Sequence, residues 1–208
     1  MSTTYYATCD SPLGELLLAG DGEALASLSV PGQRRGAAVR PDWRRDDAAP
    51  ALAAARVQLD AYFAGDLKDF ALPLAARGTD FRERVWAALD SIPFGATTTY
   101  GELAARIGAP RAAVRAVGAA VGANPLLIVR PCHRVIGADG SLTGYAGGLD
   151  RKRRLLALEG AASAVAGKVC RLASSGAVPR KAPDRGLYWA YSRDPATPRG
   201  AVPGGARR

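Results

Sequence analysis

The alternation of apolar and polar residues at the start of the chain predicts a small antiparallel sheet. Two apolar stretches flank a turn sequence between Asp10 and Gly14, which is typical of a hairpin over residues 4–19. A third apolar stretch predicts a strand over residues 24–30. Residues 31–49 are polar and rich in Pro, Arg and Asp, so we expect a loop there.

The spacing of apolar residues then changes from that of strands to that of a helix. Over residues 51–64 they recur every three or four positions, at Leu52, Ala55, Leu59 and Phe63. Gly65 predicts the end of this helix. Sheet and helix together predict a small α/β domain over residues 1–76.

Short helices are predicted after residue 76. Asp80 as the N-cap with Glu83 three residues later predicts the start of the first one. An apolar face follows in it, at Phe81, Val85, Ala88 and Leu89. A second capping-box pattern at Thr99 and Glu102 predicts the next helix, and a third should cover roughly residues 111–122.

The second and third of these helices form a helix-turn-helix candidate, because a tight turn with Gly108 and Pro110 joins them. The third helix has little side-chain bulk apart from Arg115. Either it packs closely on a neighbouring helix, or its backbone must approach a ligand closely, as in a narrow groove. The predicted fold class is α+β, with a mainly helical domain over residues 77–160.

The charge of +9 is unevenly distributed along the chain. Residues 1–76 carry 7 Lys/Arg and 10 Asp/Glu, residues 77–160 carry 12 and 7, and residues 161–208 carry 9 and 2. A basic half of this kind indicates a polyanionic partner, although charge alone does not identify it. Residues 161–208 are rich in Ala, Gly, Ser, Pro and Arg without periodicity, which predicts a disordered tail.

The composition also argues against a membrane protein, a secreted protein and a disulfide-rich protein. No apolar run approaches the ~20 residues of a membrane span, and the first residues do not resemble a secretory signal. The three cysteines, Cys9, Cys132 and Cys170, are too few and too scattered for a disulfide framework. We therefore expect a cytoplasmic protein, without membrane association.

The candidate site is a Cys–His pair at the end of a strand-like apolar run over residues 125–129. Cys132 is followed directly by His133, the only histidine of the chain. A base beside a thiol makes the nucleophilic thiolate available, and Arg130 and Arg134 add positive potential. The alternative is a buried structural cysteine next to a surface histidine.

The residues around this pair resemble the O6-alkylguanine-DNA alkyltransferase family. The sequence Pro131-Cys132-His133-Arg134-Val135 is similar to that around the family's acceptor cysteine. Further similar stretches are Phe94-Gly95, Thr99-Tyr100, Arg115-Ala116-Val117-Gly118, Asn124-Pro125, Gly144-Tyr145-Ala146-Gly147-Gly148-Leu149 and Leu155-Leu156-Ala157-Leu158-Glu159-Gly160. The resemblance is close over residues 78–160 and looser over residues 3–75.

The resemblance implies an irreversible, single-turnover transfer of an alkyl group from O6-alkylguanine in duplex DNA, with O4-alkylthymine as an open second substrate. It makes Cys132 the alkyl acceptor and His133 its base, acting through a water. Glu159 would orient the imidazole, as the third member of a triad does. Asn124 would brace the turn that carries the site, and Lys152 would stabilise it.

The resemblance also implies how the substrate is held. Tyr145 would line the guanine pocket, and the backbone of Cys132, Val135 and Ala146 would read the base. Tyr100 would donate a proton or hydrogen bond to the departing purine and crowd the phosphate that must rotate. Because O6 lies inside the duplex, the base must be flipped out.

The helix-turn-helix would bind the minor groove, and the small residues of its second helix would allow close approach. Arg115 would fill the gap left by the flipped base. The other expected DNA-binding positions are Tyr100, Ala116, Gly118, Ala119 and Gly122. The chain departs from the family pattern by one additional residue within 110–114, which alters the turn before Arg115.

The sequence also leads to expectations about metal binding and oligomeric state, and it leaves two rival functions open. Some family members carry a structural zinc, but Cys9 has no His or second Cys nearby, so we expect no metal and no cofactor. We expect a monomer, with cooperativity on DNA left open. The rival functions are a lesion sensor that binds alkylated DNA without transfer, and a cysteine hydrolase using Cys132, His133 and Glu159.

Overall fold

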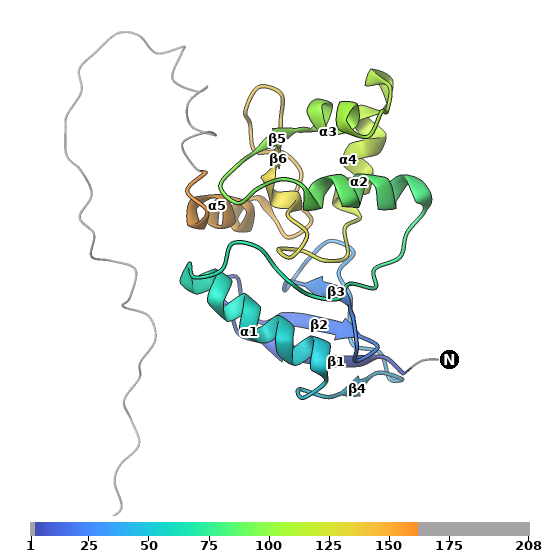
Figure 1. Cartoon of the computed structure of the whole chain (residues 1–208), viewed down its shortest axis with the longest axis vertical. Coiled ribbons are helices and arrows are strands. Elements are labelled where there is room, and N and C mark those ends of the chain that lie inside the picture. The colour runs from blue at the N-terminus through green and yellow to red at the C-terminus, as the bar shows by residue number, and fades with distance from the viewer. Residues whose placement is uncertain (1–2, 162–208) are drawn as a thin grey trace, which may run out of the picture. The chain divides into compact units, whose positions relative to one another are not determined.

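The fold is that of a computed structural model, in which residues 3–161 are described (Figure 1). Strands β1 (Tyr5–Cys9), β2 (Leu16–Gly20) and β3 (Leu25–Ser29) form an antiparallel meander, which confirms the predicted hairpin and third strand. The expected loop over 31–49 contains one further strand, β4 (Arg44–Arg45). It pairs in parallel with β1, whose free edge offers unpaired backbone groups.

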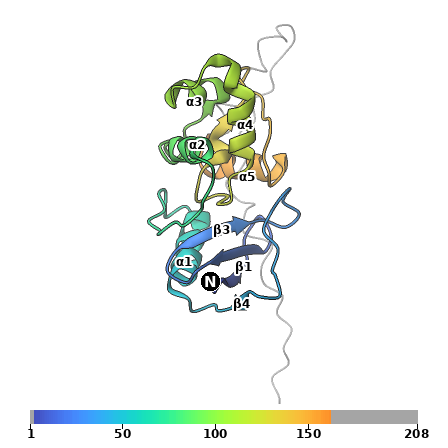
Figure 2. The ribbon, with the colours of Figure 1, turned by 90° about the vertical axis from the view of Figure 1, so that its right-hand side faces the viewer.

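Helix α1 (Pro50–Ala64) packs across one face of this sheet, as Figures 1 and 2 show. Proline starts it because a first helical residue needs no backbone donor. It ends at Gly65, whose φ of 87° lies in the left-handed region that glycine adopts without strain. The predicted helix and its stop are confirmed. The predicted domain boundary near residue 76 falls in the segment between α1 and α2.

Helix α2 (Asp80–Asp90) follows, but the predicted cap residue is wrong. The N-cap is Thr79, which has an extended backbone and accepts a hydrogen bond from Arg82 N through its hydroxyl. Asp80 is already the first helical residue, where its charge still favours the helix N-terminus. Glu83 reaches back to Gly78 N rather than to the cap residue.

The helix-turn-helix pair consists of α3 (Tyr100–Arg106) and α4 (Val114–Gly122), which pack against each other and against α2. The capping box of Thr99 and Glu102 is present, as predicted. The third helix begins differently from the expectation, because Arg111–Ala113 form a 3-10 helix before α4 starts. This tighter turn lies where the additional residue was identified.

The run over residues 125–129 is not the predicted strand. It forms tight turns, with a single bridge between Leu126 and Leu28 of β3, and Ile128 has a φ of 70°. The buried Asn124 side chain accepts a hydrogen bond from Leu126 N and donates to the carbonyls of Leu126 and Arg130. These bonds fold the run back on itself, so its apolar residues are buried with only this one bridge to β3.

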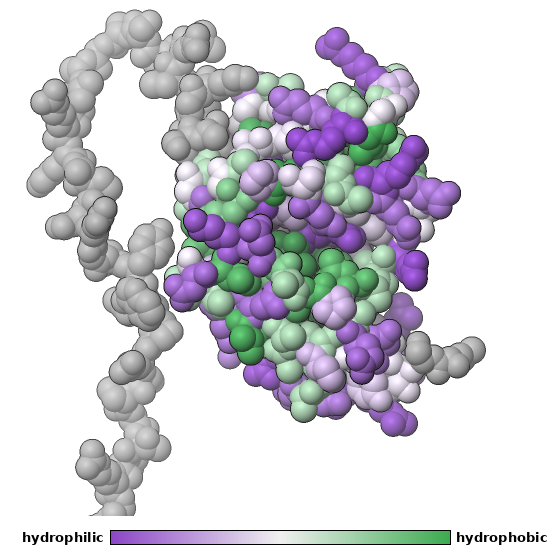
Figure 3. Space-filling view, in the orientation of Figure 1, coloured by the Kyte–Doolittle hydropathy of each residue, from purple (hydrophilic) through white to green (hydrophobic). Residues whose placement is uncertain are grey.

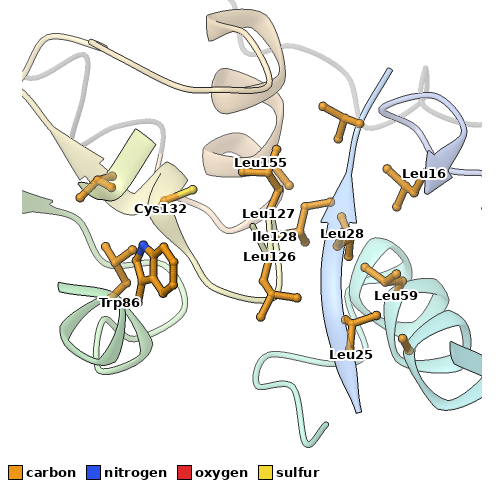
Figure 4. Close-up of a cluster of buried hydrophobic side chains, with 14 of the residues drawn as sticks. Leu16, Leu25, Leu28, Leu59, Trp86, Leu126, Leu127, Ile128, Cys132 and Leu155 are labelled. Atoms are coloured by element: carbon orange, nitrogen blue, oxygen red, sulfur yellow. The ribbon is translucent and has the colours of Figure 1, made fainter. Parts of the chain in front are cut away.

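The remaining elements carry Cys132, His133 and Glu159. A 3-10 helix, Cys132–Arg134, leads into β6 (Val135–Ile136), which pairs in parallel with β5 (Thr98–Thr99). Helix α5 (Leu149–Leu158) follows and ends at Glu159. Figure 4 shows one hydrophobic core running from Leu25 and Leu28 of the sheet through residues 126–128 to Cys132.

The surface of the described residues carries few large apolar side chains. The exposed ones are Val39, Val57, Leu74, Leu149 and Leu158. On the face drawn in Figure 3, hydrophilic and hydrophobic residues are mixed, with the hydrophobic ones gathered across the middle. None of the helices within residues 3–161 is long and apolar enough to cross a membrane. The predicted disordered tail, from residue 162 on, lies outside the described residues.

Candidate active site

The Cys132 thiol is buried, with 2% of the residue exposed, at the start of the 3-10 helix. Asn124 Nδ2 lies 3.2 Å from Cys132 Sγ and donates to it. Burial raises the pKa of Cys132 to about 11, although the Asn124 hydrogen bond and the charge of Lys152 act in the opposite direction. At neutral pH the group is therefore a thiol, and a base must take its proton before it can attack.

His133 is fully buried and has two different ring nitrogens. Its Nε2 lies 2.8 Å from Glu159 Oε1, whereas Nδ1 has no hydrogen-bond partner among the described residues. Because an ionised carboxylate only accepts, Nε2 carries the proton. Burial lowers the pKa of His133, and the hydrogen bond to Glu159 opposes this only in part. The imidazole is neutral at pH 7, with Nδ1 able to accept a proton.

Glu159 lies at the centre of the buried polar network. Its two oxygens accept five hydrogen bonds: from His133 Nε2, Tyr62 Oη (2.7 Å), Arg134 Nε (2.8 Å), Arg134 Nη2 (2.9 Å) and Gly95 N (3.4 Å). Burial alone would raise the pKa of Glu159, but the hydrogen bonds from His133 and Arg134 outweigh it and hold the pKa at about 2. The carboxylate is therefore ionised throughout the neutral range.

Lys152 and Tyr100 hold the loop beside the site. Lys152 Nζ donates to the carbonyls of Val135 (2.5 Å), Thr143 (2.7 Å) and Gly144 (3.3 Å). Tyr100 Oη lies 3.1 Å from Thr143 O and 3.2 Å from Gly144 O, the same two carbonyls. Burial lowers the pKa of Lys152 to about 8, and the nearby Cys132 opposes the shift. In this structure the Tyr100 hydroxyl faces the protein backbone.

Tyr145 and Ala146 follow on the same loop and are half-buried. The Tyr145 ring stands edge-on to His133, with 6.5 Å between the ring centres, and its buried hydroxyl has no hydrogen-bond partner among residues 3–161. Ala146 O accepts from Arg34 N, which ties the loop to the N-terminal half. Of the predicted pocket residues, Tyr145 thus lies beside His133, and the Val135 and Ala146 carbonyls are already engaged.

Helix α4 turns different residues inward and outward. Its buried residues are Val117, Ala120 and Val121. The exposed face carries Arg115, Ala116, Ala119 and Gly122. Gly118 is half-buried, and a Cβ there would contact the Tyr100 ring at 3.7 Å. Because most of the small residues point outward, close packing on a neighbouring helix does not account for them, and the alternative of close approach to a ligand is favoured.

The comparisons with known proteins agree with this arrangement. Models described as the ribonuclease-like domain and the DNA binding domain of 6-O-methylguanine DNA methyltransferase match residues 4–76 and 80–161. The methylated-DNA–protein-cysteine methyltransferase of Mycobacterium bovis is 54% identical over 155 residues, which are 74% of this chain and 92% of that protein. The chain belongs to the methylated-DNA–protein-cysteine methyltransferase family.

Relatives outside the mycobacteria and solved structures extend the match. The methyltransferase of Methanosarcina acetivorans is 51% identical over 156 residues, covering 75% of this chain and 98% of its own. The crystal structure of Mycobacterium tuberculosis OGT in complex with DNA is similar at a TM-score of 0.69 and 52% identity, covering 76% of this chain and 94% of that one. The α+β fold inferred from the sequence is therefore that of the methyltransferases.

Two residues that donate hydrogen bonds to Glu159 were missed from the sequence. Tyr62 was read only as part of an amphipathic helix, and Arg134 only as a source of positive potential. Arg134 stands next to His133, so its proximity could have been inferred. Tyr62 is 97 positions from Glu159, and no local pattern marks the contact. Within the described residues, no group of three or more His, Cys, Asp and Glu side chains is placed to hold a metal ion.

Proposed function

We propose that this protein repairs DNA by moving an alkyl group from O6 of guanine to Sγ of Cys132. Family membership supports the reaction type, since the relatives are named as methyltransferases that act on methylated DNA and a protein cysteine. The observation that carries the assignment is a buried thiol followed directly in the chain by a neutral His133, whose Nε2 is fixed on Glu159 while Nδ1 has no hydrogen-bond partner among residues 3–161.

The transfer proceeds as a displacement at the alkyl carbon. The Cys132 proton passes through a water to His133 Nδ1, and Glu159 stabilises the imidazolium that forms. Sγ attacks the alkyl carbon, so that the S–C bond forms as the C–O6 bond breaks. The electron pair stays on the purine, which takes up a proton, and Tyr100 is the proposed donor.

The surroundings of the thiol suit this chemistry. A thiolate formed in a buried site has few water molecules to solvate it, and Asn124 Nδ2 supplies one of the few donors that stabilise it. The product is a thioether, which has no ready leaving path. We therefore expect one transfer per molecule, with no cofactor taking part.

Access to the thiol requires the base to leave the duplex, because Cys132 is only 2% exposed. We assign the exposed small-residue face of α4 to the minor groove and Arg115 to the gap left by the base. Tyr145, Ala146 and Val135 would then surround the flipped guanine. A DNA complex of the relative from M. tuberculosis supports DNA as the partner.

Other arginines and lysines would bind phosphates without reading sequence. We also propose that the protein acts as a monomer in the cytoplasm, where the thiol stays reduced.

The decisive experiment mixes the protein with an excess of duplex carrying one O6-methylguanine and measures intact mass. We expect one added methyl group per molecule, on the peptide containing Cys132. Many equivalents consumed without mass gain would indicate a hydrolase, and tight binding with an unmodified Cys132 would indicate a lesion sensor. A methyl group on Cys9 or Cys170 would overturn the assignment of the acceptor.

A further inference from the structure

Tyr62 places a hydroxyl from the N-terminal half inside the network of the acceptor site. The residue is on α1, is 0% exposed, and donates from Oη to Glu159 Oε1 over 2.7 Å. The same oxygen accepts from His133 Nε2. Tyr62 and His133 therefore share one carboxylate oxygen, although they come from the N-terminal and the C-terminal half of the described chain.

Towards the Glu159 carboxylate, the Tyr62 hydroxyl can act only as a donor. Burial and the neighbouring Glu159 charge raise the pKa of Tyr62 far above its usual value, so the hydroxyl keeps its proton. Its ring is held by Phe63, Phe70 and Phe94, with ring centres 5.4, 5.3 and 6.2 Å away. The hydroxyl is thus fixed in position by rings that have no polar group of their own.

We propose that Tyr62 is a positioning residue of the transfer reaction, because its hydroxyl holds the Glu159 oxygen on which His133 is oriented. The inference rests on the proposed function. Through α1, the N-terminal half would then take part in the chemistry in addition to supporting the fold. Tyr62 does not touch the substrate or the thiol, and acts only through Glu159 and His133.

Removing the hydroxyl should change the basicity of His133 in a defined direction. The groups that act on its imidazole are Glu159, Arg134 and Lys152, with Tyr62 reaching it through the shared oxygen and Tyr145 facing its ring. With one donor fewer, Oε1 of Glu159 keeps more negative charge towards His133 Nε2. The pKa of His133 should therefore rise when Tyr62 loses its hydroxyl.

The test uses the fact that His133 is the only histidine in the chain. Protein made without a histidine tag and labelled with ¹⁵N-histidine gives one set of imidazole signals, which is titrated by NMR in the wild type and in Tyr62→Phe. We expect the pKa of His133 to rise by about half a pH unit or more, a factor of about three in proton affinity. Titration curves that superimpose would overturn the inference.

Transfer to the free base O6-benzylguanine supplies the second readout, since this substrate needs no base flipping. The acid limb of the rate against pH should move upward together with the NMR titration in Tyr62→Phe, and the plateau rate should fall several-fold. An unchanged limb and plateau, with only a lower melting temperature, would mean that the hydroxyl is structural.

Phe63→Leu is the matched control, because it disturbs the packing of the Tyr62 ring but leaves the hydroxyl in place. It should lower the melting temperature without moving the His133 titration, and a shift as large as that of Tyr62→Phe would refute the role of the hydroxyl. If Tyr62→Phe does not fold, 3-fluorotyrosine at position 62 replaces it in the test. Its hydroxyl is a stronger donor, so the pKa of His133 must then be lower than in the wild type.

If the wild type transfers no alkyl group, the proposed function is refuted instead. The NMR titration would still show whether the hydrogen bond from Tyr62 to Glu159 affects His133.

Discussion

Replacing Glu159 by glutamine tests the buried network most directly. Glutamine keeps the shape of the side chain, but it removes the charge and turns one acceptor oxygen into an NH2 donor. All the neighbours that contact the two carboxylate oxygens are donors, from Tyr62, His133, Arg134 and Gly95. Whichever way the amide lies, its NH2 group meets another donor, and Arg134 loses its counter-charge.

Two estimates of the loss agree in size. Breaking a buried ion pair by removing one partner costs ~3–5 kcal/mol. The pKa of Glu159 is held at about 2. The difference between this pKa and the usual value of about 4.3 corresponds to roughly 3 kcal/mol of stability. Since 1 kcal/mol shifts the melting temperature of a domain of this size by about 2–4 °C, Glu159→Gln should melt roughly 6–20 °C lower.

The pH dependence gives the stricter test. Because its pKa is lowered in the folded state, Glu159 stabilises the fold fully above its unfolded pKa, and this stabilisation is lost as pH falls towards 2. Burial lowers the pKa of His133 and Glu159 partly raises it, so protonation of His133 weakens the fold at acidic pH, and more so in the glutamine variant, which lacks the Glu159 charge. The difference between wild type and Glu159→Gln should therefore stay constant from pH 7 to pH 8, widen where His133 is protonated, and shrink again as Glu159 is protonated towards pH 2.

Urea unfolding followed by circular dichroism over this pH series measures the difference. Asp150→Asn in α5 is the matched control, because the Asp150 carboxylate is exposed and, among residues 3–161, forms its ion pair with the exposed Arg153. It should change stability by less than about 1 kcal/mol. A loss below about 1 kcal/mol for Glu159→Gln at pH 7, or a difference that persists unchanged at pH 2.5, would refute the reasoning.

Three further outcomes are expected. Arg115→Ala should slow repair of duplex DNA much more than reaction with O6-benzylguanine, which needs no flipping; equal losses in the two rate measurements would exclude the gap-filling role. A protein ending at residue 162 should fold and react normally but bind duplex more weakly at low salt, in a titration against salt concentration, because it lacks a segment of net charge +7; an inactive truncation would contradict this. Methylation of Cys132 should lower stability by about 1–3 kcal/mol, because it adds a methyl group to a packed site, and a melting temperature that does not fall after reaction would argue against tight packing there.

Local patterns in the sequence were sufficient for most of the secondary structure. Alternating apolar residues predicted the hairpin β1–β2, and the helical spacing before Gly65 predicted α1. The capping box at Thr99 predicted the start of α3. These features depend on hydrogen bonds and contacts between residues a few positions apart, so they are readable from the order of residues alone.

The predictions of secondary structure were wrong where a side-chain hydrogen bond that the pattern does not show decided the local backbone structure. The apolar run over 125–129 has strand-like composition, but the Asn124 side chain binds the backbone of Leu126 and the carbonyl of Arg130, and the run forms turns. Thr79 and Asp80 are both good cap residues, and the extended backbone of Thr79 selects it. Apolar composition indicates burial without specifying which backbone groups pair.

The sequence by itself determined the acceptor candidate, because Cys132 and His133 are adjacent and their neighbours carry the family motif. The tertiary structure alone decided that Tyr62 and His133 meet on one oxygen of Glu159, that His133 Nδ1 has no hydrogen-bond partner among the described residues, and that most of the small residues of α4 face outward. Residues 97 positions apart become neighbours only when the hydrophobic core brings α1 against the end of α5. Buried polar groups must then pair with whatever donors packing has placed beside them.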